Sequence, residues 1–260
     1  MKAVLSIAGS DSSGGAGIQA DIKTIAAHGL FAETAITALT AQNTLGVTGV
    51  AGVEPDFVTA QIDAVFEDIR PDAVKIGMVS SAAIIEAIAR ALARHEARNV
   101  VVDPVMVATS GARLIDDDAA VALTKLLFPL ADVITPNMPE AAALCGFAVE
   151  GESDMERAAR LLAEQSVAAV LVKGGHRSDS ADDVLALPDG SLTWLRAPRV
   201  DTRNTHGTGC TLSSAIACGL ARSLTVEQAV RSAKDYVRGA LGAGMNLGKG
   251  SGPLDHMWEY

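Results

Sequence analysis

The sequence predicts an α/β fold in which helices cover both faces of a mainly parallel β-sheet, with one small antiparallel addition. Apolar strand-like segments alternate with amphipathic helical segments along the chain, which is typical of a parallel sheet. Late in this pattern the turn at 188–191 (Pro-Asp-Gly-Ser) joins two short apolar runs and indicates a hairpin. With 260 residues, 49% of them hydrophobic and only 3% aromatic, the chain can form a single domain over 1–260 with an aliphatic core.

The strands are placed where short apolar runs end in glycine, proline or polar residues. They are expected at 3–8, 34–39, 72–76, 99–103, 131–135, 168–173, 184–187 and 192–195. The helices are placed from apolar residues at helical spacing. They are expected at 18–28, 56–69, 81–96, 116–130, 153–165 and 211–222, with one more after Glu140 and one closing the chain. Ser153 is the expected N-cap of its helix, with Glu156 completing a capping box.

The first strand runs into a glycine-rich loop at 9–17. Gly9 and Gly14 have the spacing of a P-loop, but Gly15 and Ala16 stand where that motif requires Lys and Ser or Thr. The loop therefore predicts a close backbone approach to a substrate rather than to a triphosphate.

A second glycine turn lies at 204–210, Asn-Thr-His-Gly-Thr-Gly-Cys, just before an apolar helix. Gly207 and Gly209 permit a sharp turn and a close approach of the backbone to a ligand. The first turn of the helix leaves N–H groups unpaired, with the positive end of the helix dipole behind them, and this combination binds anions. Gly207, Thr208 and Gly209 are therefore expected to hold a phosphate, with Cys210 beside it. The alternative is a purely structural turn in which Cys210 is a small buried hydrophobe.

Polar and glycine residues follow several of the predicted strands. In open α/β sheets ligands bind beyond the carboxyl ends of the strands. The residues in that position are Gly9, Gln42, Met78, Asp103, Asn137, Glu140, Lys173 and Gly174. We expect them to converge with the loop at 205–210 on one edge of the sheet.

Charge and cysteine content exclude several classes of protein. A formal net charge of −10 argues against a nucleic-acid partner, which needs a basic face. The three cysteines form no Cys-x-x-Cys pair, which indicates reduced thiols and a cytoplasmic protein rather than a zinc site. We expect neither a secretory signal nor a membrane span, since no apolar run approaches the ~20 residues that a bilayer requires.

Seven segments, in order, carry a family resemblance. They are AGSDSSGGAGIQAD (8–21), AQNT (41–44), KIGM (75–78), DPVM (103–106), TPNMPEA (135–141), KGGH (173–176) and NTHGTGCT (204–211). The chain resembles, from about residue 3 to 253, the bifunctional hydroxymethylpyrimidine/phosphomethylpyrimidine kinases of thiamine biosynthesis. The resemblance implies a ribokinase-like three-layer α/β/α sandwich and a homodimer. It also implies that ATP and Mg²⁺ serve to phosphorylate 4-amino-5-hydroxymethyl-2-methylpyrimidine to its monophosphate and then to its diphosphate.

The resemblance also assigns the nucleotide and metal residues. The ATP phosphates would lie against Asn137, Lys173, Thr208 and Gly209, and magnesium near Asp103 and Glu140. Lys173 offsets phosphate charge, and Asp103 is a hard oxygen donor that suits magnesium. The alternatives are that Lys173 lies on the surface, that Asn137 only caps a helix, and that Glu140 only complements its dipole.

The acceptor pocket is expected around Gln42. Its carboxamide matches the adjacent acceptor and donor of an aminopyrimidine edge, as it does on adenine. Met78 and Val105 would cover the ring faces, although in sequence alone such residues are more often core residues. By resemblance, Gly9, Asp21 and Cys210 complete the pocket. His206 is expected either to touch a phosphate or to be structural.

Cys210 departs from the sugar kinases of this fold, which usually place Asp here in a GAGD motif rather than GTGC. A helix N-terminus lowers the pKa of a thiol, so Cys210 is expected to accept the proton of the acceptor alcohol. A thiol that stays neutral also avoids the repulsion between a carboxylate and a phosphate acceptor, which is on the order of 1 kcal/mol or more. The competing hypotheses are a pyridoxal kinase, a Cys210–His206 hydrolase and a pyrimidine-binding protein without activity.

Overall fold

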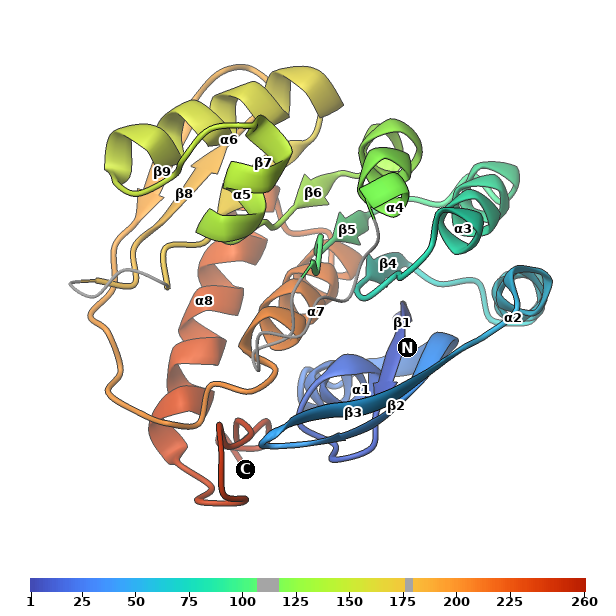
Figure 1. Ribbon diagram of the computed structural model, residues 1–260, viewed down its shortest axis with the longest axis horizontal. Coiled ribbons are helices and arrows are strands. Elements are labelled where there is room, and N and C mark those ends of the chain that lie inside the picture. Colours follow the sequence, from blue (N-terminus) through green and yellow to red (C-terminus); the bar gives the residue numbers. More distant parts are fainter. Residues whose placement is uncertain (107–116, 176–179) are drawn as a thin grey trace.

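The computed structural model describes residues 1–106, 117–175 and 180–260, and these form one continuous sheet with helices on both faces (Figure 1). The strands are β1 (Ala3–Asp11), β2 (Phe31–Asn43), β3 (Gly46–Gly52), β4 (Ala73–Ile76), β5 (Val100–Val102), β6 (Val133–Ile134), β7 (Ala169–Val172), β8 (Asp183–Ala186) and β9 (Leu192–Leu195). The helices are α1 (Gly17–Ala27), α2 (Pro55–Asp68), α3 (Ala82–Arg94), α4 (Asp117–Ala122), the π-helical turn η1 (Leu123–Leu127), the 3₁₀ turn η2 (Phe128–Leu130), α5 (Met138–Cys145), α6 (Glu152–Ser166), α7 (Thr208–Ala221) and α8 (Val226–Ala243). None of the helices described is long and apolar enough to cross a bilayer.

Within the described residues the strand order is β3-β2-β1-β4-β5-β6-β7-β8-β9. The strands from β2 to β7 pair in parallel, whereas β3, β8 and β9 pair antiparallel with their neighbours. This arrangement confirms the predicted mainly parallel sheet and the predicted hairpin, now β8–β9. It adds a second antiparallel edge, β3, that the sequence did not predict.

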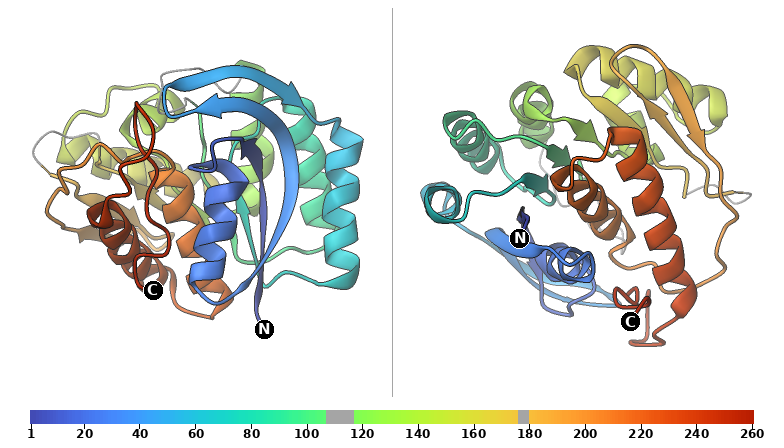
Figure 2. Two further views of the ribbon diagram at one scale, coloured as in Figure 1. Left: turned by 90° about the horizontal axis from the view of Figure 1, so that it is seen from below. Right: turned by 180° about the vertical axis from the view of Figure 1, so that it is seen from behind.

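Two apolar cores separate the three layers. Alternate residues of the buried strands point to opposite faces, as the period of a strand requires. Leu5 and Ile7 pack against α2, α3 and their neighbours, whereas Val4 packs against α1, α7 and α8. Figure 2 shows these two groups of helices on opposite faces of the sheet. The aliphatic cores confirm what the low aromatic content predicts.

Several element boundaries differ from the expected ones. The helix expected at 116–130 divides into α4, η1 and η2, and its first residue, Asp116, lies outside the described residues. The N-cap expected at Ser153 is wrong, because α6 begins one residue earlier and Gly151 is its N-cap. Asp154 accepts from the backbone N–H of Gly151, whereas Glu156 accepts from the indole of Trp194.

Helix α7 begins three residues before the expected start, and this shift matters for the site. Gly207 is its N-cap and has a φ of 84°, a left-handed conformation that favours glycine. Gly209 and Cys210 therefore belong to the first helical turn. Their N–H groups are among those that a helix cannot pair internally.

Candidate active site

A cleft of about 1160 Å³ opens along the carboxyl ends of the parallel strands. The predicted site residues that line it are Gly9, Gln42, Met78, Asp103, Val105, Asn137, Glu140, Lys173, Gly207, Thr208, Gly209 and Cys210. Lys173 and Cys210, which the sequence separates by many residues, thus share one cleft. The segment KGGH also contributes Gly175, whereas His176 lies outside the described residues.

Lys173 and Asp103 form an ion pair at the centre of the cleft. Lys173 Nζ lies 2.8 Å from Asp103 Oδ1, which also accepts from the Thr135 hydroxyl at 3.0 Å. Burial alone would lower the pKa of Lys173, but the charges of Asp103 and Glu140 outweigh it and raise that pKa. Lys173 is therefore a cation held in place by Asp103. It does not lie on the surface, which was the alternative interpretation of the sequence.

Asn137 and Glu140 form a reciprocal capping box at the start of α5. The Asn137 side chain accepts from the N–H of Glu140 at 2.9 Å, and Glu140 Oε2 accepts from the N–H of Asn137 at 2.8 Å. Burial raises the pKa of Glu140 against the lowering effect of Lys173, and the nearby charge of Asp103 raises it further. The capping interpretation is thus confirmed, while both side chains also face the cleft.

The loop at 205–210, which we call the anion loop, touches the Lys173–Asp103 pair. A Cβ added to Gly209 would lie 3.3 Å from Asp103 Oδ2 and 3.5 Å from Lys173 Nζ. Thr208 is tied within the loop, because its hydroxyl donates to the carbonyl of Thr205 at 2.8 Å. Unpaired N–H groups at the start of α7 therefore lie next to a buried cation, which suits a phosphoryl group.

The lowered pKa expected for Cys210 is wrong. Burial raises the pKa of its thiol to about 11, and the nearby Lys75 ammonium lowers it only in part. Asp21 and Asp103 raise it further. The thiol is consequently protonated at neutral pH, as the argument for a neutral side chain beside a phosphate acceptor requires.

The part of the cleft where the acceptor is expected is lined by Gln42, Met78 and Val105 around Gly9. Gln42 follows an irregularity in the β2–β3 pairing, and its Oε1 accepts from the Thr40 hydroxyl at 3.0 Å. A Cβ on Gly9 would lie only 3.1 Å from the sulfur of Met78, so glycine lets the first loop pack tightly here. The carboxamide of Gln42 thus faces a pocket with an apolar wall.

Asp21 does not line the cleft, which argues against the direct substrate contact expected for it. It is fully buried and paired with Lys75, whose Nζ lies 2.8 and 3.0 Å from its two oxygens. The hydroxyls of Ser6 and Ser214 also donate to it, at 2.6 and 2.8 Å. With these donors its oxygens are occupied, and Asp21 ties β1, β4 and α7 together beneath Cys210.

The polar pairs that were not predicted from the sequence include two beside the cleft residues discussed above. One is Lys75–Asp21, although a lysine within an otherwise apolar strand is a recognisable signal of a buried ion pair. The other is Asp11–His206, in which the His206 ring lies 2.8 Å from Asp11 Oδ2. The Ser and Gly residues after Asp11 indicate an Asx turn, but sequence spacing does not reveal its histidine partner.

Comparison with known proteins gives a consistent assignment. A model of the phosphomethylpyrimidine kinase family matches residues 11–255. A hydroxymethylpyrimidine/phosphomethylpyrimidine kinase of Rhizobium meliloti (strain 1021) is 52% identical over 259 residues, which cover 98% of this chain and 97% of the relative.

Two solved structures resemble the fold closely. The phosphomethylpyrimidine kinase of Clostridium difficile 630 has a TM-score of 0.82 and 43% identity, with 92% of this chain and 98% of that chain covered. An ADP complex of Bacillus subtilis pyridoxal kinase has a TM-score of 0.92 and 35% identity, with 100% and 98% covered. The likeness to these kinases confirms the predicted fold and activity class. The chain belongs to the phosphomethylpyrimidine kinase family.

Proposed function

We propose that this chain transfers the γ-phosphoryl group of ATP to the hydroxymethyl group of 4-amino-5-hydroxymethyl-2-methylpyrimidine, and then to the monophosphate so formed. The observation that supports this most directly is the shared cleft. It brings Gln42 and Cys210 together with the Lys173–Asp103 pair and the anion loop. Acceptor and donor phosphate would then meet at the start of α7.

The nucleotide would extend from the anion loop toward α8. This end of the cleft has an apolar lining suited to adenosine: Pro198, Val200, Leu212, Val237 and Leu241. Lys173 and the N–H groups of Gly209 and Cys210 would hold the γ-phosphoryl group and stabilise its charge during transfer. Asn137 lines the cleft where the phosphates would pass.

Asp103 and Glu140 fit a magnesium site. Both are oxygen donors on the cleft wall, and Asp103 Oδ2 faces the anion loop at Gly209. Among the described residues no cluster of three or more His, Cys, Asp or Glu could hold a metal by itself. This suits Mg²⁺, which commonly takes one or two carboxylates and completes its shell with phosphates and water. When bound, the ion would neutralise phosphate charge.

Recognition of the pyrimidine would depend on Gln42. Its Oε1 is oriented by Thr40, so its amide can pair with the ring nitrogen and amino group of the acceptor. Met78 and Val105 would lie against the ring. Asp21 and Lys75 would not contact the substrate. They would instead hold β1, β4 and α7 in position beneath the cleft.

The catalytic position of Cys210 is compatible with both acceptors because its thiol is neutral. As the acceptor oxygen bonds to phosphorus and the bond to ADP breaks, the hydroxymethyl proton would pass to an oxygen of the transferred phosphoryl group, because a thiol that is already protonated cannot take it. Cys210 lies in the cleft where the acceptor oxygen would be. A phosphate monoester is largely dianionic and needs no base. One pocket would thus serve both steps.

A coupled assay of ADP release tests the proposed function. We expect ATP- and Mg²⁺-dependent turnover with the pyrimidine and with its monophosphate. The likeness to pyridoxal kinase makes pyridoxal the third acceptor to compare. Turnover of pyridoxal without turnover of either pyrimidine would contradict the proposal and favour a pyridoxal kinase.

Replacing Cys210 with aspartate tests the charge argument. The Cys210→Asp variant is expected to lose about tenfold more kcat/KM with the monophosphate than with the alcohol, because a nearby carboxylate repels a dianion by ~1.4 kcal/mol or more. Cys210→Ser, which stays neutral, is the control and should affect both steps alike. Equal losses in both steps for Cys210→Asp would contradict the argument.

A second copy of this chain is the protein partner that we propose. The β2–β3 hairpin exposes Leu39, Leu45 and Val50. These apolar side chains on an edge hairpin support self-association into a homodimer.

A further inference from the structure

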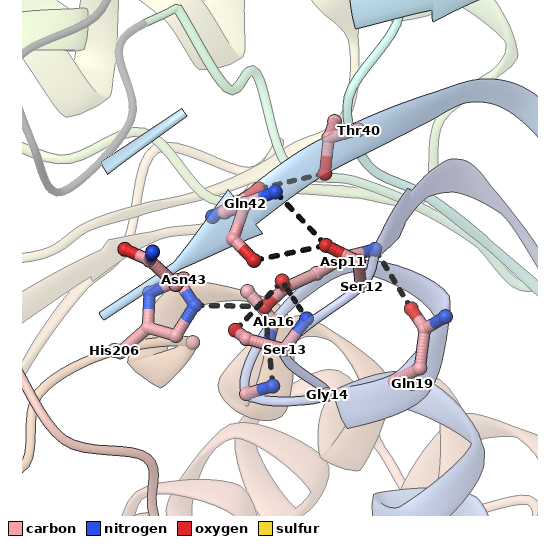
Figure 3. A network of polar contacts seen from close by, with 12 residues as sticks. Asp11, Ser12, Ser13, Gly14, Ala16, Gln19, Thr40, Gln42, Asn43 and His206 are labelled. Atoms are coloured by element: carbon pink, nitrogen blue, oxygen red, sulfur yellow. Dashed lines mark hydrogen bonds and ion pairs between the residues drawn. The ribbon is translucent and has the colours of Figure 1, made fainter. Parts of the chain in front are cut away.

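Asp11 is a shared acceptor for two glycine loops that the chain places far apart. Its buried carboxylate accepts from the N–H groups of Ser13, Gly15 and Ala16 at 2.8, 3.1 and 2.8 Å, and from the Ser13 hydroxyl at 2.8 Å. Across the cleft wall, His206 Nε2 lies 2.8 Å from Oδ2, although the two residues are 195 positions apart (Figure 3).

The charge of Asp11 fixes the direction of this contact. Burial alone would raise its pKa, but the hydrogen bonds from His206 and Ser13 outweigh burial and lower the pKa to about 2. Because an ionised carboxylate only accepts hydrogen bonds, Nε2 of His206 must carry the proton. The contact is therefore charge-assisted and stronger than one between neutral groups.

The two loops also touch through their backbones. A Cβ on Gly207 would lie 1.9 Å from the carbonyl oxygen of Gly15, and a Cβ on Gly15 would lie 2.4 Å from Cδ2 of His206. Glycine is required at both positions for this contact. On its other side His206 is held by its backbone N–H, which donates to the carbonyl of Gly252 at 3.0 Å.

The loop at 9–17 is joined in turn to the acceptor end of the cleft. Ser12 Oγ accepts from the backbone N–H of Gln42 and donates to its carbonyl, each at 2.9 Å. Figure 3 shows Gln42 on its strand beside the loop that Asp11 organises. The peptide bond between Asp11 and Ser12 thus joins two sets of hydrogen bonds, one from Ser12 to Gln42 and one from Asp11 to His206 and the anion loop.

We propose that Asp11 and His206 are positioning residues that hold the anion loop in register with the acceptor pocket. Glycine-rich loops have many accessible conformations, and transfer requires the acceptor oxygen and the phosphoryl group to be aligned. The hydrogen bond between His206 and Asp11 selects one relative position of the two loops. The proposal rests on the proposed kinase function and adds a specific cause for the geometry of its site.

Two substitutions at His206 separate its hydrogen bond from its bulk. Glutamine places an amide N–H close to the position of Nε2, whereas the shorter asparagine does not reach Asp11. We expect His206→Asn to lower kcat on the order of 10²-fold with both acceptors, since a displacement of about 1 Å has effects of that size. The KM for ATP should change less than about threefold, because the adenosine end is distant. His206→Gln should recover most of kcat.

Alkylation gives a readout that does not depend on turnover. In the absence of nucleotide, iodoacetamide should modify Cys210 faster in His206→Asn than in wild type or in His206→Gln. The reason is that the loop that carries Cys210 is no longer held by the hydrogen bond to Asp11. Mass spectrometry locates the label. Ser12→Ala, at the other face of the same loop, should raise the KM for the pyrimidine and leave the Cys210 alkylation rate unchanged. If His206→Asn does not fold, Asp11→Asn replaces it, with the same loss of kcat expected.

The outcomes are distinguishable. Wild-type protein inactive on both acceptors would overturn the proposed function, and the alkylation rates would still test the positioning role. Active wild type with unchanged kcat in His206→Asn, or with equal losses in His206→Asn and His206→Gln, would overturn the role of the hydrogen bond. Equal alkylation rates in all variants would do the same.

Discussion

Replacing Lys173 with methionine is expected to lower kcat by about 10²- to 10³-fold for both acceptors, the range seen when one preorganised charge or donor is removed from a transition state. Lys173 is the cation that pairs with Asp103 and lies against Gly209 of the anion loop. Its side chain is only 14% exposed, so water cannot replace its charge effectively. Steady-state rates with the pyrimidine and with its monophosphate measure the effect.

The controls for Lys173 separate charge from folding. Lys173→Arg keeps the charge but not the compact shape of the ammonium, and should retain more activity than Lys173→Met. The exposed Lys125, outside the cleft, provides a matched Lys125→Met variant that should behave as wild type. Thermal unfolding confirms that each variant folds. A folded Lys173→Met variant with kcat within about tenfold of wild type would contradict the assigned role.

Replacing Lys75 with methionine is expected to lower the free energy of unfolding by about 3–5 kcal/mol, the cost of leaving a buried charge without its partner. Both Lys75 and Asp21 have fully buried side chains. Burial alone would lower the pKa of Lys75, but the charge of Asp21, its ion-pair partner, raises it, so the lysine keeps its charge. Chemical denaturation at pH 7 measures the change.

A second variant shows whether the unpaired charge is the cause. Lys75→Met combined with Asp21→Asn removes both charges, and should recover much of the stability lost in Lys75→Met alone, because no isolated carboxylate remains. In the wild type the Ser6 and Ser214 hydroxyls donate to different oxygens of Asp21. In the double variant one of them can still donate to the carboxamide oxygen, and the other can turn to accept from the amide nitrogen. A double variant no more stable than Lys75→Met would point to packing instead.

Much of the fold follows from local patterns in the sequence. Alternating strands and helices specify the parallel sheet, and chemistry-bearing residues directly after strands specify which edge carries the site. Gln42, Asp103 and Lys173 are predicted to meet for this reason, and the cleft contains all three. Strand β3 was missed because it is glycine-rich and exposed on an edge, so neither apolar alternation nor burial marks it.

The wrong predictions at the site, for Asp21 and Cys210, arise because the spacing of residues in the sequence does not show how deeply a side chain is buried. Asp21 occupies a helix position between buried residues Ile18 and Ile25, and that pattern is the signal that it faces inward. For Cys210, the position at a helix N-terminus favours a lowered pKa, but burial raises the pKa to about 11 and the nearby Lys75 lowers it only in part. The sequence shows the first effect but not the depth at which the sulfur lies.

The contact between Asp11 and His206, with Gly252 behind His206, has a consequence for how the protein is made. A ribosome delivers the chain from its amino end, so the first glycine loop emerges long before its partners. If this contact positions the anion loop as proposed, the candidate site would be complete only after residue 252 has left the exit tunnel. A nascent chain of this protein would therefore remain inactive until residue 252 has emerged.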